Sequence, residues 1–310
     1  MKQSTDKILM IRPVAFEMNK ETAVNNYFQK TLNLNAEAIN AKVQKEFDDF
    51  VDILKASGID VFVYDDIADL KTPDSIFPNN WISFHENGNI ALYPMFAENR
   101  RRERRQDILE DLEQKGFQFH QVYDYTSAED ENIFLEGTGS LILDRVNRKA
   151  YCALSPRANE ELLIEFCEDF EFLPIPFKAY QTVGSKRLPI YHTNVMMCVG
   201  TDIAIVCFDS VDDKADKKLL SKSLKEDNKT IVEISEQQLE AYAGNMLEVQ
   251  NRNGDKFLVM STQAYKSLQA TQVQTIEQYL KILHSPLNTI ETLGGGSARC
   301  MIAEIFNAKN

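Results

Sequence analysis

The chain has 310 residues, of which 44% are hydrophobic and 26% are charged, a composition typical of a globular protein with a substantial core. Its formal net charge of −13 at pH 7 argues against nucleic acid or an anionic membrane surface as the main partner. No apolar run reaches the ~18 residues that a membrane-spanning helix needs, and the first residues lack a signal-peptide pattern.

Apolar runs with strand or helix periodicity alternate along the whole chain, which predicts an α/β fold. Strands are expected at 8–11, 60–64, 81–85, 90–93, 117–123, 140–143, 150–154, 172–177, 190–199, 203–208, 230–234, 246–250, 257–260 and 289–292. Helices are expected at 36–57, 99–115, 158–169, 214–224, 236–243 and 271–283, with a further helix that begins at Cys300. Turn-forming residues at 86–89, 199–202 and 251–255 predict hairpins between consecutive strands.

A unit of hairpin, helix and strand recurs at intervals of roughly 50–70 residues, which indicates a repeated architecture. No linker rich in Pro, Gly or Ser interrupts it, so a single domain is expected over residues 1–310. The five cysteines have neither the spacing of a disulfide framework nor that of a zinc site, so a reducing, cytoplasmic location is expected. No P-loop, dinucleotide fingerprint or HExxH motif is present, so neither a cofactor nor a metal is expected.

The first polar features are two asparagines and a cluster of arginines. Asn80 and its neighbour Asn79 precede the single tryptophan, and their amides can both donate to and accept from a neutral ligand. Turn formation before a strand is the simpler interpretation. Arginines dominate the run 100–105, where they would ordinarily face solvent in ion pairs along a helix. One or two of them, like Arg157 after a predicted strand, could instead bind a carboxylate bidentately.

Two further residues could take part in acid–base chemistry. Glu136 lies between an apolar triplet and two nearby glycines, so its carboxylate is expected to be partly buried and to need a partner. His192 opens an apolar strand in which alternation would place it on the same face as Asn194. A histidine of near-neutral pKa is a natural general acid or base, although a lone histidine is more often a structural one.

A glycine-rich loop followed by a cysteine is the most informative motif of the chain. Gly294, Gly295 and Gly296 allow close approach of a backbone or ligand, and Cys300 follows where a helix is expected to begin. The positive end of a helix dipole favours a thiolate, which is the nucleophilic form of cysteine. The competing interpretation is a small buried hydrophobe, which describes the other four cysteines in their apolar runs.

The order of these residues resembles that of the guanidine-modifying enzymes, which include arginine deiminases, dimethylarginine dimethylaminohydrolases and amidinotransferases. The similarity extends from Asp74 to Ile305 and is strongest at Leu135-Glu136-Gly137, at Leu154-Ser155-Pro156-Arg157, at His192-Thr193-Asn194 and in the segment 294–301. It implies a pentein-type α/β propeller with five pseudo-symmetric blades around a polar channel, which agrees with the repeated unit.

The resemblance also implies roles for individual residues. Cys300 would be the nucleophile, His192 the general acid and base, and Glu136 the third member of the catalytic set. The substrate α-carboxylate would be held by Arg157 and Arg101. The other expected substrate-binding residues are Asp74, Asn80, Asn194 and Gly295.

Departures from the family pattern bear on the substrate. Deiminases clamp the cationic guanidinium with aspartates at the positions of Asn80 and Asn194, and both residues are neutral here. Asparagine suits a neutral ureido group, so we expect a hydrolase of a ureido or guanidino amino acid, with citrulline-like substrates preferred. Asn80 also resembles family members that convert arginine directly to ornithine. Gly139 stands where relatives often have aspartate, which puts the geometry behind Glu136 in question.

Other interpretations remain open. The same fold and residues would serve an amidinotransferase if the site excluded water and admitted an amine. A non-catalytic binding module is a third class, because a ribosome anti-association factor has a similar propeller; the acidic charge disfavours it. A chance motif in a catalytically inert α/β protein is a fourth. The expected partner is a small amino acid, a homodimer remains open, and either 18–35 or the polar stretch before Asp74 could form a lid.

Overall fold

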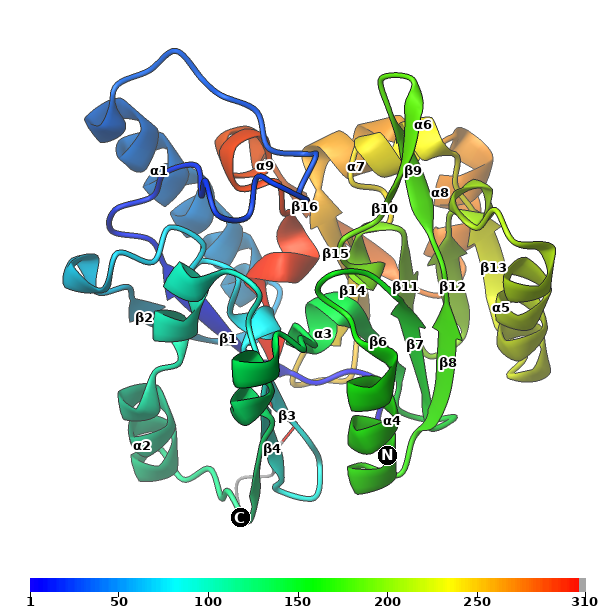
Figure 1. Cartoon of the computed structure of the whole chain (residues 1–310), viewed down its shortest axis with the longest axis horizontal. Helices are drawn as coiled ribbons and strands as arrows, with labels where there is room; N and C mark the ends of the chain where they lie inside the picture. Colours follow the sequence, from blue (N-terminus) through cyan, green and yellow to red (C-terminus); the bar gives the residue numbers. More distant parts are fainter. Residues whose placement is uncertain (307–310) are drawn as a thin grey trace.

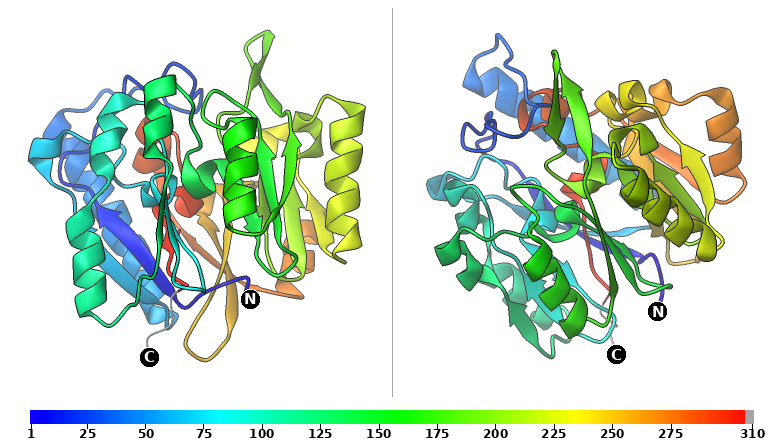
Figure 2. Two further views of the ribbon diagram at one scale, coloured as in Figure 1. Left: turned by 60° about the horizontal axis from the view of Figure 1, so that its bottom comes forward. Right: turned by 45° about the vertical axis from the view of Figure 1, so that its right-hand side comes forward.

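Five three-stranded sheets form the framework of the computed structural model, which describes residues 1–306. In each sheet the middle strand is antiparallel to one neighbour and parallel to the other (Figure 1). The sheets are β17 (Ala303–Glu304), β1 (Lys7–Arg12) and β2 (Asp60–Asp65); β3 (Ile82–Phe84), β4 (Ile90–Leu92) and β5 (Val122–Asp124); β6 (Leu141–Asp144), β7 (Lys149–Ala153) and β8 (Leu173–Phe177); β11 (Met197–Val199), β12 (Ile203–Val206) and β13 (Thr230–Glu233); and β14 (Leu247–Gln250), β15 (Lys256–Ser261) and β16 (Lys281–Ser285). A separate hairpin of β9 (Tyr180–Val183) and β10 (Lys186–Pro189) projects from this body (Figure 2).

Helices connect the middle strand of each sheet to its parallel partner, so the predicted unit of hairpin, helix and strand is confirmed. The connecting helices are α1 (Ala36–Ala56), α2 (Gln106–Gln114), α4 (Glu160–Asp169), α5 (Lys214–Glu226) and the pair α7 (Thr262–Ser267) and α8 (Ala270–Glu277). They lie around the outside of the molecule (Figure 1). The remaining helices are α3 (Gly137–Ser140), α6 (Glu236–Glu240) and α9 (Asn288–Gly294). Other 3-10 turns are η1 (Ala68–Leu70), η3 (Glu98–Glu103), η4 (Thr126–Glu131) and η6 (Phe208–Ser210).

Helix α1 illustrates how the sequence builds these units. The Asn35 side chain caps its N-terminus by accepting from the backbone N–H of Ala38. Val43, Phe47 and Leu54 lie on one face of the helix and are fully buried against the β1–β2 sheet and α9. Among residues 1–306, no helix combines the length and apolar character that crossing a bilayer requires.

The two ends of the described chain meet in one sheet. Ile8 of β1 pairs with Glu304 of β17, and Leu9 pairs with Ala303. Strand β17 therefore completes the sheet that β1 and β2 begin, and it fixes the segment that carries Cys300.

Short turns lie directly ahead of the strand that is antiparallel to the middle strand in each sheet, near the middle of the molecule (Figure 1). They are η2 (Pro78–Asn80) before β3, α3 before β6, η5 (Thr193–Val195) before β11, η7 (Ala298–Met301) before β17 and the loop 241–246 before β14. Helix α3 contacts η2 and η5, and η2 contacts η7. The turns η2, α3, η5 and η7, which belong to different sheets, thus lie together in one region.

The strand predicted at 289–292 is wrong, because this segment is helix α9. Thr289, Ile290 and Thr292 favour a strand by propensity. The carboxylate of Glu46, on α1, accepts from the backbone N–H groups of Thr289 and Ile290 at distances of 2.9–3.1 Å and so caps the helix from a distance. A tertiary contact overrides local preference here.

Other predicted elements also need correction. The strand at 117–123 is reduced to β5 at Val122–Asp124, and the helix at 99–115 divides into η3 and α2. The helix at 271–283 ends at Glu277, and the chain then forms β16 because Lys281–Ser285 pairs in parallel with β15. The strand at 190–199 is interrupted by η5, so alternation does not describe the relation between His192 and Asn194. The helix expected from Cys300 is the 3-10 turn η7, which gives way to strand β17.

Candidate active site

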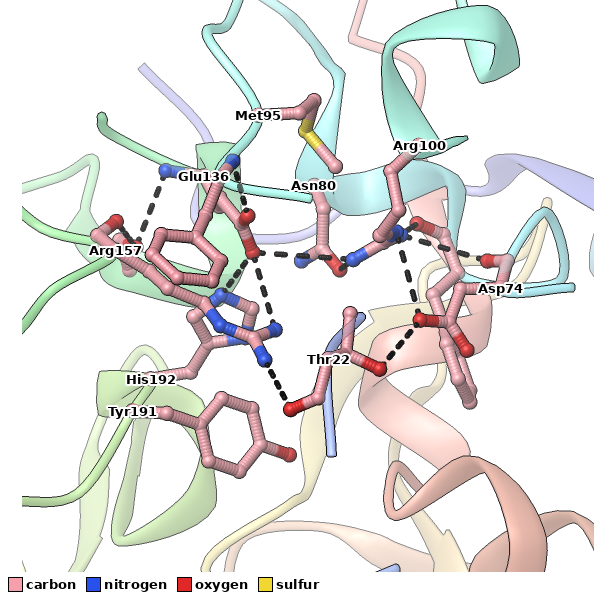
Figure 3. A network of polar contacts seen from close by, with 12 residues as sticks. Thr22, Asp74, Asn80, Met95, Arg100, Glu136, Arg157, Tyr191 and His192 are labelled. Atoms are coloured by element: carbon pink, nitrogen blue, oxygen red, sulfur yellow. Dashed lines mark hydrogen bonds and ion pairs between the residues drawn. The ribbon is translucent and has the colours of Figure 1, made fainter. Parts of the chain in front are cut away.

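Glu136 and His192 form the centre of a buried polar network (Figure 3). The Nε2 atom of His192 lies 2.7 Å from Oε2 of Glu136, and both side chains are almost completely inaccessible to solvent. Burial lowers the pKa of His192 to about 4, although the Glu136 carboxylate acts in the opposite direction. Burial would raise the pKa of Glu136, but the Arg157 guanidinium and the His192 hydrogen bond hold it well below its ordinary value. The resting pair is therefore a neutral imidazole beside a carboxylate.

Two buried arginines surround this pair. Nη1 of Arg157 lies 3.5 Å from Oε2 of Glu136, and Nη1 of Arg100 lies 3.8 Å from the same oxygen. Arg100 also forms ion pairs with Glu103 at 2.9 Å and with Asp74 at 3.8 Å. Burial raises the pKa of Glu103 to about 8, although the two hydrogen bonds that its oxygens accept from Arg100 act in the opposite direction. The two guanidiniums thus face the carboxyl groups of Glu103, Asp74 and Glu136.

Arg101 does not take the place that the sequence predicted for it. Its Nε donates to the Met95 carbonyl, and its ion pair is with Glu129 at 3.5 Å, away from the network. The residue before it, Arg100, enters the site instead. The run adopts the 3-10 turn η3, in which residues three apart share a face, so Arg100 and Glu103 point inward together.

Cys300 is buried in η7, where two asparagine amides contact its sulfur. Nδ2 of Asn194 lies 3.3 Å from Sγ, and Nδ2 of Asn245 lies 3.2 Å from it. Asn245 also accepts from the backbone N–H of Arg299 at 3.0 Å, so one amide fixes both the backbone and the thiol. No α-helix begins at Cys300, so the helix dipole predicted to act on its thiol is absent. The amide N–H groups of Asn194 and Asn245 contact the sulfur instead.

Among residues 1–306, the amides of Asn80 and Asn194 each have one buried atom without a hydrogen-bond partner. Oδ1 of Asn80 accepts from Nη1 of Arg100 at 2.8 Å, which leaves the Asn80 NH₂ group as an unpartnered buried donor. The Nδ2 atom of Asn194 contacts Cys300, and Oδ1 of the same amide is an unpartnered buried acceptor. Oδ1 of Asp74 is also unpartnered. Asn80 and Asp74 line the space beside Cys300 and offer a ligand one donor and one acceptor, whereas Asn194 contacts Cys300 without lining that space.

Two glycines are required by close packing around these groups. A Cβ on Gly139 would lie 2.3 Å from Nδ2 of Asn80 and 2.8 Å from Nδ1 of His192. Gly295 has a φ of +63°, and its carbonyl accepts from the Tyr191 hydroxyl at 2.6 Å. The absence of a side chain at Gly139 is thus what lets the amide and the imidazole come together.

The N-terminal loop (residues 13–35) covers the site. The Thr22 carbonyl accepts from Nη2 of Arg157 at 3.0 Å, and the Thr22 hydroxyl donates to Asp74 at 3.1 Å (Figure 3). Oδ1 of Asn25 accepts from Nε of Arg157 at 2.9 Å, and Asn26 donates to the Gly294 and Gly295 carbonyls. The space left beneath the loop is about 10 Å³, room for about one water molecule. The structure is therefore a closed form.

Residues on the walls of this space include most of the predicted set. Cys300, His192, Asn80, Arg157 and Asp74 all line it. Among residues 1–306, no group of three or more His, Cys, Asp or Glu side chains is placed to hold a metal ion.

A sequence model of the protein family described as N,N dimethylarginine dimethylhydrolase, eukaryotic, matches residues 12–307. The chain belongs to this family.

Solved structures share the fold of this dimethylarginine dimethylhydrolase family member at low identity. The N-terminal domain of ArgZ, described as an arginine dihydrolase from the ornithine-ammonia cycle in cyanobacteria and bound to substrate, is 15% identical with a TM-score of 0.71, over 97% of this chain and 99% of that one. The DDAH from Pseudomonas aeruginosa, in complex with citrulline, is 14% identical with a TM-score of 0.64, over 98% of this chain and 100% of that one.

The chain spans 41% of full-length ArgZ, to which it is 15% identical with a TM-score of 0.74 over 98% of its own length. No curated protein sequence matches this chain. At these identities the solved structures establish a shared fold, and the family membership rests on the sequence model.

Four residues that contact the candidate site of this family member were not identified from the sequence. Asn245 and Tyr191 lie beside predicted residues, and Thr22 and Asn25 belong to a loop that has neither helix nor strand. Asn245 had a signal, because it precedes the first strand of its sheet as Asn80 and Asn194 precede theirs. The segment 18–35 was considered as a lid, and it lies over the site, but the contacts of Thr22 and Asn25 had no signal because they depend on how the loop folds back.

Proposed function

We propose that the protein is a cysteine-dependent hydrolase that cleaves a C–N bond of a ureido or guanidino amino acid. The observation that carries this proposal is a single buried cavity whose wall includes the Cys300 thiol and the His192 imidazole, with Glu136 behind the imidazole. A nucleophile, a base and a group that orients the base are the minimal set for covalent catalysis. Membership of a dimethylarginine dimethylhydrolase family supports the same reaction class.

The reaction would proceed through a covalent thiol intermediate. Neutral His192 takes the thiol proton as Sγ of Cys300 adds to the central carbon of the substrate, and the resulting imidazolium is stabilised by Glu136. That imidazolium returns its proton to the departing amine as the C–N bond breaks. Water then attacks the S-linked carbon, His192 accepts a water proton, and cleavage of the C–S bond restores the thiol.

The amides in the site favour a neutral ureido group as the reacting end. Arg100 fixes Asn80 so that its NH₂ can donate to a ureido oxygen, and Oδ1 of Asn194 can accept from a ureido N–H. A guanidinium has no oxygen for the Asn80 donor, and its charge would find an amide where deiminases supply a carboxylate. Citrulline-like substrates are therefore the preferred class, and an arginine-type guanidino group is the alternative.

Arg157 and Asp74 suit the amino-acid end of the substrate. The Arg157 guanidinium bonds the loop atoms of Thr22 and Asn25 in the closed form, and a substrate carboxylate would replace one of these neutral acceptors with a charged one. The unpartnered Oδ1 of Asp74 is available to a substrate ammonium group. Because the closed cavity is too small for an amino acid, the N-terminal loop would act as a lid that opens for binding.

The proposal also concerns the architecture of the chain, its cofactors and its location. We infer that the five sheets are pseudo-symmetric propeller blades of one catalytic domain, since turns that belong to different sheets lie together. The chemistry of these residues needs no cofactor or metal. A cytoplasmic location remains a prediction, as does a homodimer.

The deciding experiment is ammonia release from L-citrulline and L-arginine, assayed side by side, with the amino-acid product identified by mass. Ornithine from citrulline is expected and would establish a ureido hydrolase. Ornithine from arginine, with two ammonia molecules per turnover, would identify a dihydrolase, and citrulline from arginine would identify a deiminase. Turnover that requires an added amine acceptor would identify an amidinotransferase. Absence of turnover with either substrate, or with N-methylated arginines, would contradict the proposal.

A further inference from the structure

Three hydroxyl side chains lie behind the Glu136–His192 pair, outside the cavity. They belong to Ser140, Ser155 and Thr193, and none of the three lines the space beneath the N-terminal loop. Ser140 and Thr193 are completely buried. Each hydroxyl donates one hydrogen bond and accepts another, in both cases with backbone atoms, so each one links two segments of the chain.

Ser140 joins the segment that carries Glu136 to the segment that carries Arg157. Its Oγ accepts from the backbone N–H of Glu136 at 3.2 Å and donates to the Arg157 carbonyl at 2.8 Å. The Glu136 N–H also donates to that carbonyl at 3.1 Å. The two backbones are therefore held together directly behind the carboxylate and the guanidinium, whose Oε2 and Nη1 atoms are 3.5 Å apart.

Thr193 joins His192 to the same group of segments. Its Oγ1 donates to the Ser140 carbonyl and accepts from the backbone N–H of Ala153 in β7 at 2.7 Å. Thr193 follows His192 directly, so this hydroxyl fixes the backbone from which the imidazole projects. Ser140 is the last residue of α3 and Glu136 precedes its first, so the imidazole and the carboxylate are connected across this short helix.

Ser155 completes a closed set of links. Its Oγ accepts from the backbone N–H of Arg157 at 3.1 Å and donates to the Tyr191 carbonyl at 2.8 Å, next to His192. The three segments that carry Glu136, Arg157 and His192 are thus joined pairwise. With only two links, one segment could pivot about another, whereas three links fix the relative position of all three.

The fold itself does not need the Thr193 hydroxyl. Four turns ahead of strands in different sheets share a backbone pattern, in which the carbonyl of the first residue accepts from the N–H of the fourth. They begin at Phe77, His192, Tyr242 and Ser297. The second residue of these turns is, in the same order, Pro78, Thr193, Ala243 and Ala298. Three of the turns therefore form without a hydroxyl at this place, and the hydroxyl occurs in the turn that carries the imidazole.

We propose that Ser140, Ser155 and Thr193 are positioning residues, which hold the His192 imidazole against the Glu136 carboxylate. This inference rests on the proposed function, in which His192 takes and returns a proton. An ionised carboxylate can only accept, so Nε2 of His192 carries the ring proton and Nδ1 is free to act as the base. The 2.7 Å contact with Glu136 then sets both the tautomer and the orientation of the imidazole.

The kinetics of matched variants test this role. Thr193→Val keeps the shape of the side chain but removes the hydroxyl, and should lower kcat for citrulline roughly tenfold, the scale of one buried hydrogen bond. KM should change little, because Thr193 does not line the cavity. Thr193→Ser keeps the hydroxyl and should retain kcat near the wild-type value. Ser223→Ala removes a buried hydroxyl on α5 that bonds Tyr151, and should leave kcat unchanged.

Nuclear magnetic resonance of protein labelled with nitrogen-15 in histidine reads the contact directly. A ring N–H that donates to a buried carboxylate has a low-field proton resonance, and the His192 signal is identified by its loss in His192→Gln. We expect this signal in the wild-type protein and in Thr193→Ser. In Thr193→Val and in Ser140→Ala it should move to higher field or disappear through exchange with water.

Three results would overturn the proposal. They are a Thr193→Val protein that keeps both kcat and the resonance, a Thr193→Ser protein that loses as much as Thr193→Val, and an equal loss in Ser223→Ala. If Thr193→Val does not fold, Ser140→Ala and Ser155→Ala carry the same test. The resonance is measured without substrate, so it tests the positioning role even if citrulline is not hydrolysed. Absence of turnover in wild-type protein with the resonance intact would count against the proposed function alone.

Discussion

Nη1 of Arg100 donates to Oδ1 of Asn80 over 2.8 Å, and this contact decides which end of the Asn80 amide faces the cavity. The amide cannot turn over without placing its NH₂ group against a guanidinium, where two donors would meet. Arg100 is itself fixed by Glu103 and Asp74. In the proposed function, Asn80 would contact the reacting end of the substrate, and Arg100 would set its selectivity by fixing the orientation of the Asn80 amide.

Replacing both neutral amides with carboxylates should change substrate preference. In the Asn80→Asp/Asn194→Asp protein we expect kcat/KM for citrulline to fall by roughly 100-fold, since a lost or repelled polar contact in a buried site costs about 2–5 kcal/mol. The preference for arginine over citrulline should rise, because two carboxylates face the guanidinium. The measurement is kcat/KM for both substrates, with the exposed Asn253→Asp as the matched control. An unchanged preference would show that these amides do not select the substrate.

Cys300→Ser should abolish turnover without altering the fold. A serine hydroxyl at this position retains the amide contacts but is a much poorer nucleophile than a thiol. Ammonia release and the circular dichroism melt measure the two effects separately. In wild-type protein quenched during turnover, mass spectrometry should detect the adduct on the peptide that contains Cys300. Activity retained in the serine variant would remove the nucleophile assignment.

Asn245→Ala should lower kcat while leaving KM nearly unchanged. Asn245 holds the thiol and the backbone of Arg299 but does not line the cavity. Loss of these buried hydrogen bonds costs about 1–3 kcal/mol, which corresponds to a roughly 5- to 150-fold fall in kcat if it acts at the reacting sulfur. Asn253→Ala, in an exposed hairpin turn, is the control. A change in melting temperature with kcat unaffected would indicate a purely structural role.

The pH dependence of activity should reflect the buried histidine. Burial lowers the pKa of His192 to about 4, so the imidazole stays neutral, and able to take a proton, well below its ordinary value of about 6.5. The acid limb of kcat/KM should therefore lie near pH 4. The free energy of unfolding should also decrease as pH falls. Between pH 4 and 6.5 the unfolded chain binds this proton more readily than the folded chain, so His192 destabilises the fold as pH falls through that window. An acid limb near pH 6.5 in folded protein would contradict the depressed pKa.

Gly139→Ala should reduce activity more than it reduces stability. The new Cβ would force Asn80 and His192 apart, because its distances to them would be 2.3 and 2.8 Å. Overpacking of this kind costs about 1–3 kcal/mol in unfolding free energy, whereas a displaced base and amide affect the transition state directly. Calorimetric unfolding and kcat are the two readouts. Full activity in the alanine variant would mean that the site tolerates a wider arrangement.

The sequence identified much of this site because the relevant residues carry local signals. Glu136, His192 and Cys300 belong to short motifs whose order along the chain resembles a known family, and the structure brings their turns together. Arg101 was misplaced by one residue, because the resemblance assigned it to the substrate carboxylate, whereas in the 3-10 turn η3 it is Arg100 that enters the site. Only the burial of Glu103, the ion-pair partner of Arg100, would have indicated that Arg100 points into the site.

The elements that prediction missed depend on contacts distant in the sequence. Helix α9 needs the Glu46 carboxylate at its N-terminus, and β16 needs the edge of β15. The loop that covers the site makes its contacts through Thr22 and Asn25 to Arg157, which lies more than a hundred residues away. Periodicity reports which face of an element is buried, but not which distant group will satisfy its ends.

The pairing of β17 with β1 has a consequence for synthesis on the ribosome. Because the chain grows from its N-terminus, Cys300 and the strand that anchors it emerge after all the other sheets have been made. Until β17 reaches β1, the histidine, the carboxylate and the amides can assemble without a thiol among them. With Cys300 as the proposed nucleophile, a nascent chain would therefore become active only after β17 has been made.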